Sequence, residues 1–457
     1  MASIVWVILP LSGSFNASVK LARDLKDAGH QVSYLGLPDS EDEVCGNGFE
    51  FTPVFERWFP KGFYAEHEKL GLMGLAEALP AIRDMVGRFN AFIEALLADR
   101  DTSFAAAVDR LRPDLMLFVN SGETVTIPAL LAHAAGIRSA YVYDMLCRGE
   151  DLAIPPVTTP LPPGNTLRAR GRVFMAWKRV WFARRVVEKA CARLGLQVDW
   201  PRMVGRLAIK CGYPPGQIDT LTDTAAFRMR LPELVLYPLE FEFPGAGLPG
   251  RHHIEASIDL SRRQCEFPWE WLAPGRPLGL CAVGTMVWLG RPALLRFFQT
   301  VIDAAAGMPD WQWVVATGNG LDAGDFDGVP PNVVVVNRAP QLALLERAGL
   351  MINHGGANTV KECAYFGVPM ILFPHVNDTP GVTARAVYHG LGLRGDILRI
   401  TAPALRDLIG QIDGTCYYRA QARLMSLKFR EAEQAGEGLR LVEALLATPA
   451  PCLPPRA

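Results

Sequence analysis

A histidine and two glycines separate a short apolar run from a predicted helix in the C-terminal third of the chain. The run Leu350–Asn353 is followed by His354, Gly355 and Gly356, and the helix opens near Asn358. Glycine lets a ligand approach the backbone closely, and the free N–H groups at a helix N-terminus attract anions. The His354 ring can donate a hydrogen bond to a phosphate oxygen. The segment therefore predicts a site for a diphosphate-bearing nucleotide at the carboxyl end of a parallel sheet.

Two further side chains on the predicted helix extend this site. Thr359 lies in the first turn and can offer a hydroxyl, and Glu362 lies about one turn after Asn358, where its carboxylate could accept from ribose hydroxyls. A glycine pair between a strand and a helix is also typical of an ordinary tight turn. The longer string from His354 to Gly381, which reads HGGANTVKECAYFGVPMILFPHVNDTPG, is far more specific.

That string resembles the donor-site signature of the UDP-glycosyltransferase superfamily, the inverting GT-B glycosyltransferases, and is most similar to their bacterial macrolide and carotenoid branch. Other segments agree in order. CAVGT at 281–285 resembles the family's Ser-x-Gly-Thr strand end, and NRAPQLALL at 337–345 resembles the loop that holds the base. RPDLMLFVN and LKDAGHQVSYLG resemble strands of the N-terminal domain. The resemblance covers most of the chain, thinly between about 60 and 105 and between 150 and 230.

The resemblance implies a role for each matching donor-site residue. The residues that would face the diphosphate are His354, Gly355, Gly356, Asn358 and Thr359. Glu362 would bind ribose, Ala339, Pro340 and Gln341 would frame the base, Thr285 would touch phosphate or sugar, and Asp378 would hold sugar hydroxyls. The family usually has Asp-Gln at this last position, whereas this chain has Asp378-Thr379, which weakens the expectation of glucose.

The implied activity is an inverting transfer of a hexose or deoxyhexose from a UDP- or dTDP-sugar to a small or lipophilic acceptor. The nucleotide sugar is a co-substrate, and neither a cofactor nor a metal is implied. The sequence Asp325–Asp327 looks like a metal-binding DxD, but it lies in a glycine-rich loop and is interpreted as a solvated acidic turn. The alternative function is that of a catalytically silent, nucleotide-sugar-binding accessory protein.

The family's catalytic base is missing from its expected position. Most members have a histidine near the start of the first helix and an aspartate that orients it, as in other His–Asp pairs. The matching positions here are Ser14 and Asn120, so both members of the pair are replaced.

Three explanations of this replacement remain open. The acceptor can be an anion, such as a carboxylate or phosphate, that needs no base. Another side chain can serve as the base, with Glu123, Asp144 and His67 as candidates. The third explanation is that the protein binds a nucleotide sugar without transferring it.

A basic segment with aromatic residues follows a proline-rich loop in the middle of the chain. Arg168–Arg185 contains seven Arg or Lys residues and no acidic residue. A helix here would place Val173, Trp177 and Trp181 near one face. The pattern fits an ordinary amphipathic surface helix with basic side chains reaching into solvent, and it also fits an acceptor lid or a membrane-surface contact for a lipidic or anionic acceptor.

The elements that position these residues alternate between strands and helices, which favours parallel sheets covered by helices. Strands are expected at Ile4–Leu9, Gln31–Gly36, 112–120 and Ser139–Tyr143, and helices at Ala17–Ala28 and Ile127–Ala135. The alternation resumes in the C-terminal half. The predicted fold class is α/β of the GT-B type, with two Rossmann-like doubly wound domains facing across a cleft.

The expected domain boundaries follow this division. Residues 1–245 form an N-terminal acceptor domain, 246–268 a linker, 269–425 a donor domain, and 426–447 a helix that returns to the N-terminal domain. The 457 residues are half hydrophobic and a fifth charged, with a net charge of −1, so nucleic acid is not an expected partner. Nine scattered cysteines without a CxxC pair indicate a reducing compartment. A cytoplasmic location is expected, with membrane-surface contact as the alternative for the basic segment.

Overall fold

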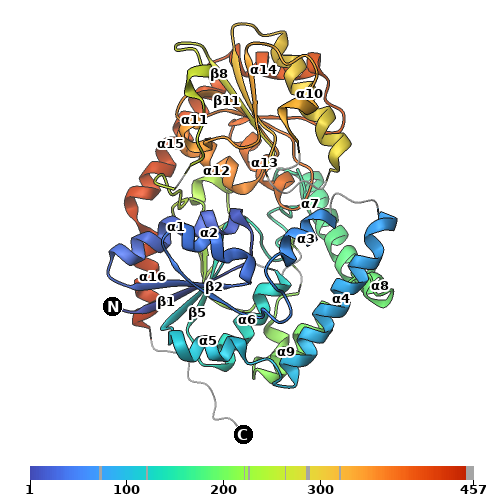
Figure 1. Cartoon of the computed structure of the whole chain (residues 1–457), viewed down its shortest axis with the longest axis vertical. Helices are drawn as coiled ribbons and strands as arrows, with labels where there is room; N and C mark the ends of the chain where they lie inside the picture. The colour runs from blue at the N-terminus through green and yellow to red at the C-terminus, as the bar shows by residue number, and fades with distance from the viewer. Residues whose placement is uncertain are drawn as a thin grey trace.

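Two parallel sheets, one in each half of the chain, form the framework of this computed structural model (Figure 1). It describes residues 1–70, 75–119, 122–220, 222–224, 227–262, 264–284, 289–318 and 321–448, and for residues 67–70, 75–77 and 123 only the backbone. Among the described helices, none combines the length and apolarity needed to cross a bilayer.

The N-terminal sheet has seven strands in the order β3-β2-β1-β4-β5-β6-β7. Their bounds are β1 Ser3–Ile8, β2 Gln31–Gly36, β3 Glu50–Pro53, β4 Leu115–Val119, β5 Ser139–Tyr143, β6 Glu233–Val235 and β7 Arg251–His253. The helices around it are α1 Ser12–Asp27, α2 Glu41–Gly46, α3 Phe63–Leu70, α4 Leu75–Leu97, α5 Ser103–Leu111, α6 Glu123–Ala134, α7 Leu167–Phe182, α8 Glu188–Arg193 and α9 Trp200–Lys210. A π-helical turn, Ala183–Val187, joins α7 to α8.

The C-terminal sheet has six strands in the order β10-β9-β8-β11-β12-β13. Their bounds are β8 Leu278–Ala282, β9 Gln312–Ala316, β10 Val333–Val336, β11 Ala348–Asn353, β12 Met370–Leu372 and β13 Gly392–Arg394. The helices are α10 Arg291–Ala306, α11 Gln341–Leu345, α12 Ala357–Phe366, α13 Thr379–Tyr388, α14 Ala402–Asp413, α15 Tyr417–Ala435 and α16 Glu437–Ala447. The prediction of two doubly wound α/β domains is confirmed.

Both sheets are covered on both faces, which explains why their strands are nearly continuous apolar runs. All residues of β4 are buried, and so are the central residues of β1 and β11. In each sheet the strand order reverses once, between β1 and β4 and between β8 and β11. Ligands of such sheets bind at the carboxyl ends of the strands beside this reversal. These two places are therefore where functional residues are to be sought.

Two boundaries differ from the expected ones. Strand β7, Arg251–His253, pairs with β6, so the N-terminal sheet extends into the range expected as linker. Helix α1 begins at Ser12 instead of Ala17, because Phe15 in the added turn packs into the N-terminal core. This earlier start places Ser14 in the first turn of α1, at the carboxyl end of β1.

The C-terminal end of the chain returns to the N-terminal domain, as expected (Figure 1). The return is made by two helices, because Gly436 adopts a left-handed conformation with φ of 60° and breaks the run. Helix α15 packs on α12, and α16 packs on α1 with Val442 in the N-terminal core. Glu255 accepts the N–H of Gly438 at 3.0 Å at this junction.

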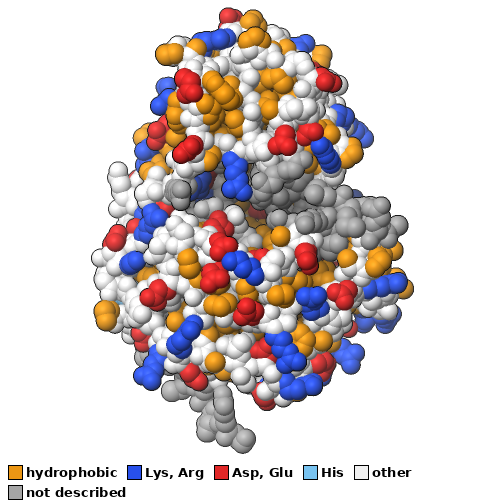
Figure 2. All heavy atoms as spheres, viewed as in Figure 1, with side chains coloured by type: hydrophobic (Ala, Val, Ile, Leu, Met, Phe, Trp, Pro, Cys, Tyr) orange, Lys and Arg blue, Asp and Glu red, His pale blue; other side chains and the backbone are white. Residues whose placement is uncertain are grey.

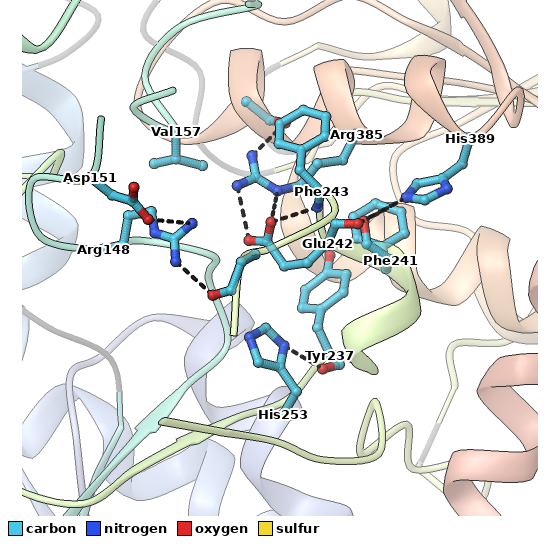
Figure 3. A network of polar contacts seen from close by, with 12 residues as sticks. Arg148, Asp151, Val157, Tyr237, Phe241, Glu242, Phe243, His253, Arg385 and His389 are labelled. Carbon is cyan, nitrogen blue, oxygen red and sulfur yellow. Dashed lines mark hydrogen bonds and ion pairs between the residues drawn. The ribbon is translucent and has the colours of Figure 1, made fainter. Parts of the chain in front are cut away.

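A buried ion pair joins the two domains (Figure 3). Arg385 on α13 donates from Nε and Nη2 to the two carboxylate oxygens of Glu242, both at 2.9 Å. The Phe243 ring lies 4.5 Å from the Arg385 guanidinium. Burial alone would raise the pKa of Glu242, but Arg385 outweighs it and the pKa is lowered. His389 approaches the carbonyl oxygens of Phe241 and Glu242 at 3.1 and 3.2 Å.

Replacing Arg385 by Met should destabilise the fold by about 3–5 kcal/mol, because Glu242 would be left charged, buried and unpaired. The matched control is Arg399→Met, since Arg399 is 87% exposed and faces Asp396 across 3.9 Å. Its removal should change the free energy of unfolding by less than about 0.5 kcal/mol. Denaturant unfolding of both variants checks this, and equal small losses would contradict the role given to Arg385.

Candidate functional site

His354 lies at the strand-order reversal of the C-terminal sheet. It directly follows β11, and its ring packs against Gly284, which follows the neighbouring strand β8. A Cβ atom at Gly284 would lie 2.7 Å from the His354 Cε1 atom, so only glycine leaves room for the ring. Burial lowers the pKa of His354 to about 4, so the imidazole is neutral at pH 7. Its Nδ1 is buried and has no hydrogen-bond partner among the described residues, which leaves it available to a ligand.

The N-terminus of α12 lies where the sequence predicts an anion site. Gly355 has φ of 79°, and its N–H donates to the Asn353 side-chain oxygen at 2.7 Å. This turn presents the first N–H groups of α12, beginning near Gly356, with Thr359 partly exposed in the first turn. Asn358 donates its side-chain N–H to the Gly13 carbonyl at 2.8 Å. The first turn of α12 therefore touches the first turn of α1 in the other domain.

Glu362, the predicted ribose ligand, is buried and held from two sides. Arg262 donates to Oε1 at 2.7 Å, and Gln341, the first residue of α11, donates to Oε2 at 2.5 Å. Each carboxylate oxygen retains a lone pair for a ribose hydroxyl. Ala339 is half-buried just before α11. The structure thus gathers the predicted base and ribose residues within one hydrogen-bonded cluster.

Asp378, the predicted sugar ligand, is buried at the start of α13. Its Oδ2 has no hydrogen-bond partner among the described residues. Burial raises the pKa of Asp378 to about 7, and the Asp144 carboxylate acts in the same direction. The neighbouring Thr379 hydroxyl donates to the Val376 carbonyl at 2.7 Å and accepts from the His375 N–H. Thr379 thus stabilises the turn that presents Asp378.

Among the candidates for the catalytic base, the structure brings Asp144 to Ser14. The Ser14 hydroxyl donates to Asp144 Oδ2 at 3.2 Å, and both side chains are buried. Asp144 directly follows β5, so sheet geometry brings it to the carboxyl end of β1 although 130 residues separate the two. Its other oxygen, Oδ1, has no partner among the described residues. Asn120 and Thr285 lie outside the described residues, and Glu123 begins α6 with its side chain outside the description.

Lys361 is a residue of this site that the sequence interpretation missed. It lies on α12, four residues after Ala357, and is buried, with no hydrogen-bond partner for Nζ among the described residues. Burial lowers the pKa of Lys361 to about 8, against the opposing effects of Asp144 and Glu362. Conversely, burial raises the pKa of Asp144, and Lys361 partly offsets the increase. The sequence gives no clear signal for it, because α12 also carries Asn358, Thr359 and Glu362.

Tyr237 was also missed and supports the same region. Its hydroxyl donates to the Ala357 carbonyl at the start of α12, and its ring lies 5.9 Å from Lys361 Nζ. Tyr237 follows β6 in the N-terminal sheet, so this contact is another link between the domains. Its position in the sequence offers no pattern that would have indicated this role.

Metal ligands are a separate question. Within the part of the chain that the structure describes, no group of three or more His, Cys, Asp or Glu side chains is arranged to hold a metal. In the acidic loop 325–327, Asp325 forms an ion pair with Arg291 at 2.7 Å and accepts the Asp322 N–H.

The arrangement combines two chemical functions. The C-terminal half offers N–H groups, a neutral imidazole and hydroxyls where a diphosphate can bind. The N-terminal half offers a buried carboxylate, Asp144, directly across the domain junction. An anion site facing a carboxylate base can support displacement of a diphosphate leaving group by a hydroxyl.

Known proteins resemble this chain in sequence and in fold. Residues 300–435 match the family model "Erythromycin biosynthesis protein CIII-like, C-terminal domain". The chain is 25% identical over 394 residues to demethyllactenocin mycarosyltransferase of Streptomyces fradiae, covering 85% of this chain and 74% of the relative.

Two solved glycosyltransferase structures share the fold. The glycosyltransferase of kitacinnamycin superposes with a TM-score of 0.69 at 24% identity, over 97% of this chain and 99% of that one. The glycosyltransferase VinC, solved in complex with dTDP, superposes with a TM-score of 0.61 at 19% identity, over 96% of this chain and 99% of that one.

Replacing His354 by Ala should weaken UDP or dTDP binding by about 1–3 kcal/mol, because a donor to the diphosphate is lost. Isothermal calorimetry measures the change. The matched control is His375→Ala, since His375 is an exposed histidine of the same domain and should leave the affinity unchanged. Unchanged binding by the His354 variant would remove this residue from the site.

Proposed function

Because the chain belongs to the UDP-glycosyltransferase superfamily of GT-B glycosyltransferases, we propose that it moves a hexose or deoxyhexose from a UDP- or dTDP-sugar to a small or lipophilic acceptor. The transfer inverts the anomeric carbon and needs no metal. The observation that carries the proposal is the meeting of α12 with α1. The anion site at Asn358 contacts Gly13, one residue before the Ser14–Asp144 pair.

Inversion follows from the opposite placement of the two groups. The diphosphate lies on the C-terminal domain and the carboxylate on the N-terminal domain, so the acceptor approaches the sugar from the side opposite the leaving group. The acceptor oxygen forms a bond to the anomeric carbon while the bond to the phosphate oxygen breaks. The electron pair leaves with the diphosphate, which α12 and His354 stabilise, and the acceptor proton passes to Asp144.

An apolar cavity in the N-terminal domain supports a lipophilic acceptor. It lies at the carboxyl ends of β1, β2 and β3, beside α4 and α6, and its walls are almost entirely aliphatic and aromatic. Leu9, which lines it, lies in the loop between β1 and α1, close to Ser14 in the chain. Its volume of about 50 Å³ is well below the range of a whole ligand pocket. The cavity therefore suits one apolar group of a larger acceptor.

The Ser14–Asp144 contact favours a substitute base among the three explanations for the missing histidine. Ser14 is a poor base itself, but its hydroxyl orients Asp144 and leaves Oδ1 for the acceptor hydroxyl. Burial raises the pKa of Asp144, which strengthens it as a base. An anionic acceptor would meet repulsion from Asp144 and the nearby Asp378, so a neutral hydroxyl is the better substrate class.

Lys361 acts as the counter-charge that keeps Asp144 ionised. A buried carboxylate without a nearby cation would retain its proton and could not act as a base at neutral pH. The charged groups that interact with Lys361 come from both domains and are Asp144, Glu362, Arg262 and Glu433. Lys361 does not need to touch the substrate for this role, and we therefore regard it as a positioning residue.

Asp144→Asn should lower kcat by about 10²–10⁴-fold, the usual contribution of a general base. UDP affinity should stay unchanged, because the amide keeps the shape of the carboxylate. Steady-state kinetics with a panel of hydroxyl acceptors measures the effect.

Two outcomes would contradict the assignment of Asp144. An undiminished rate in the Asn variant would favour an anionic acceptor that needs no base. Binding of UDP-sugars by the unaltered protein, without hydrolysis or transfer to any acceptor, would favour the catalytically silent alternative.

Lys361→Met should move the acid limb of the pH–rate profile to higher pH. Removing the cation disfavours the ionised Asp144, so its pKa rises and more base is needed to deprotonate it. The kinetics are measured at saturating donor. Asp378 has a pKa of about 7, and saturation removes the effect of its protonation on sugar binding from the measured rate. The matched control is Lys428→Met on α15, an exposed lysine whose removal should leave the limb in place. An unmoved limb in the Lys361 variant would refute the electrostatic role.

A further inference from the structure

The segment 167–194, here called the α7–α8 ridge, exposes an unusual number of large apolar side chains. It consists of α7, the π-helical turn and α8. Leu167 is 89% exposed, Trp181 42% and Phe182 54%. The other exposed apolar side chains of the ridge are Phe174, Met175, Val186, Val187 and Leu194. Scattered exposed apolar residues are normal, but a contiguous group of them marks an interaction surface.

The same ridge concentrates positive charge. Between residues 167 and 194 there are nine Arg or Lys residues and a single acidic residue, Glu188, whereas the whole chain has a net charge of −1. Glu188 is ion-paired with Arg184 at 3.1 Å, and the exposed cations include Arg168, Arg172 and Lys178. Figure 2 shows basic and hydrophobic side chains next to each other at the edge where α8 lies in Figure 1.

The exposed face is not a misplaced core face, because the ridge has a second, buried side. Val173, Ala176 and Trp177 are buried, and the Trp177 ring N–H donates to the Ile154 carbonyl at 3.0 Å. The loop that carries Ile154 continues to Val157, whose carbonyl accepts the Gly381 N–H of α13 at 2.7 Å. The ridge is thus fixed to the protein on one side and open on the other.

We propose that the α7–α8 ridge docks on an anionic lipid surface. Helices that lie in a membrane interface combine Lys and Arg with Trp, Phe and aliphatic side chains, as the exposed face of the ridge does. Anionic headgroups complement the excess positive charge, and the apolar side chains enter the acyl boundary. A second copy of this chain fits less well, because a symmetric contact would place two strongly basic ridges against each other. Docking would hold the cleft at the membrane surface, where lipophilic molecules are concentrated.

Co-sedimentation of the intact protein with vesicles tests this inference. We expect binding to vesicles that contain phosphatidylglycerol, weak binding to pure phosphatidylcholine, and a loss of binding as salt is raised. Replacing Arg168, Arg170 and Arg172 together by Gln should weaken binding by roughly a hundredfold, on the scale of several-fold per basic side chain. Trp181→Ser combined with Phe182→Ser should weaken it as well, through loss of apolar insertion.

The matched control is Leu424→Ser combined with Leu427→Ser on α15, where both leucines are more than half exposed but lie outside the ridge. This control should bind vesicles like the unaltered protein. The proposal is overturned if anionic vesicles do not bind, if the ridge variants and the control lose binding equally, or if the ridge variants instead change the oligomeric state. UDP affinity measured on every variant separates a failure of this proposal from a failure of the donor site.

Discussion

The contact between the two domains is the constraint on which the site depends, and the buried pair of Arg385 and Glu242 fixes it. Neither half of the chain contains the complete site. The anion site belongs to α12, whereas Asp144 follows β5 of the other sheet. Arg385 lies on α13, the helix that begins next to Asp378, and so the ion pair fixes this helix of the C-terminal domain against the N-terminal one (Figure 3). A buried pair of this kind adds little net stability, but it specifies one geometry because either partner alone is costly.

Within that geometry, burial has opposite consequences for acids and bases. It lowers the pKa of His354 to about 4, so the residue beside the expected diphosphate is a neutral hydrogen-bond donor. It raises the pKa of Asp144 and lowers that of Lys361, whereas the charge of each side chain partly offsets the effect of burial on the other. A histidine base would be oriented by its own aspartate. In the proposed mechanism a carboxylate is oriented by Ser14 and a lysine supplies the charge from the other domain, so the proposed base is complete only when the domains meet.

Much of the fold, and the elements that carry the proposed donor site, could be predicted from the sequence, because both rest on local patterns. The strands Gln31–Gly36 and Ser139–Tyr143 were predicted with the bounds that the structure gives them, since buried parallel strands are short apolar runs. The glycines around His354 are informative because only they allow the ring and the turn to fit. The proximity of Ser14 to Asp144 could not be predicted, because it depends on sheet order across 130 residues. Lys361 was missed for a related reason, since only the domain contact gives its charge a role.

The central claim is that Asp144 receives the proton of the acceptor hydroxyl. In this account Asp144 lies across the domain junction from the bound diphosphate. A crystal structure of the intact protein with a non-hydrolysable nucleotide sugar and a hydroxyl acceptor measures this most directly. The account predicts the diphosphate at the N-terminus of α12 and the acceptor oxygen within about 2.6–3.2 Å of an Asp144 carboxylate oxygen. An acceptor oxygen held by Glu123, or by any other group beyond hydrogen-bond reach of Asp144, would contradict it.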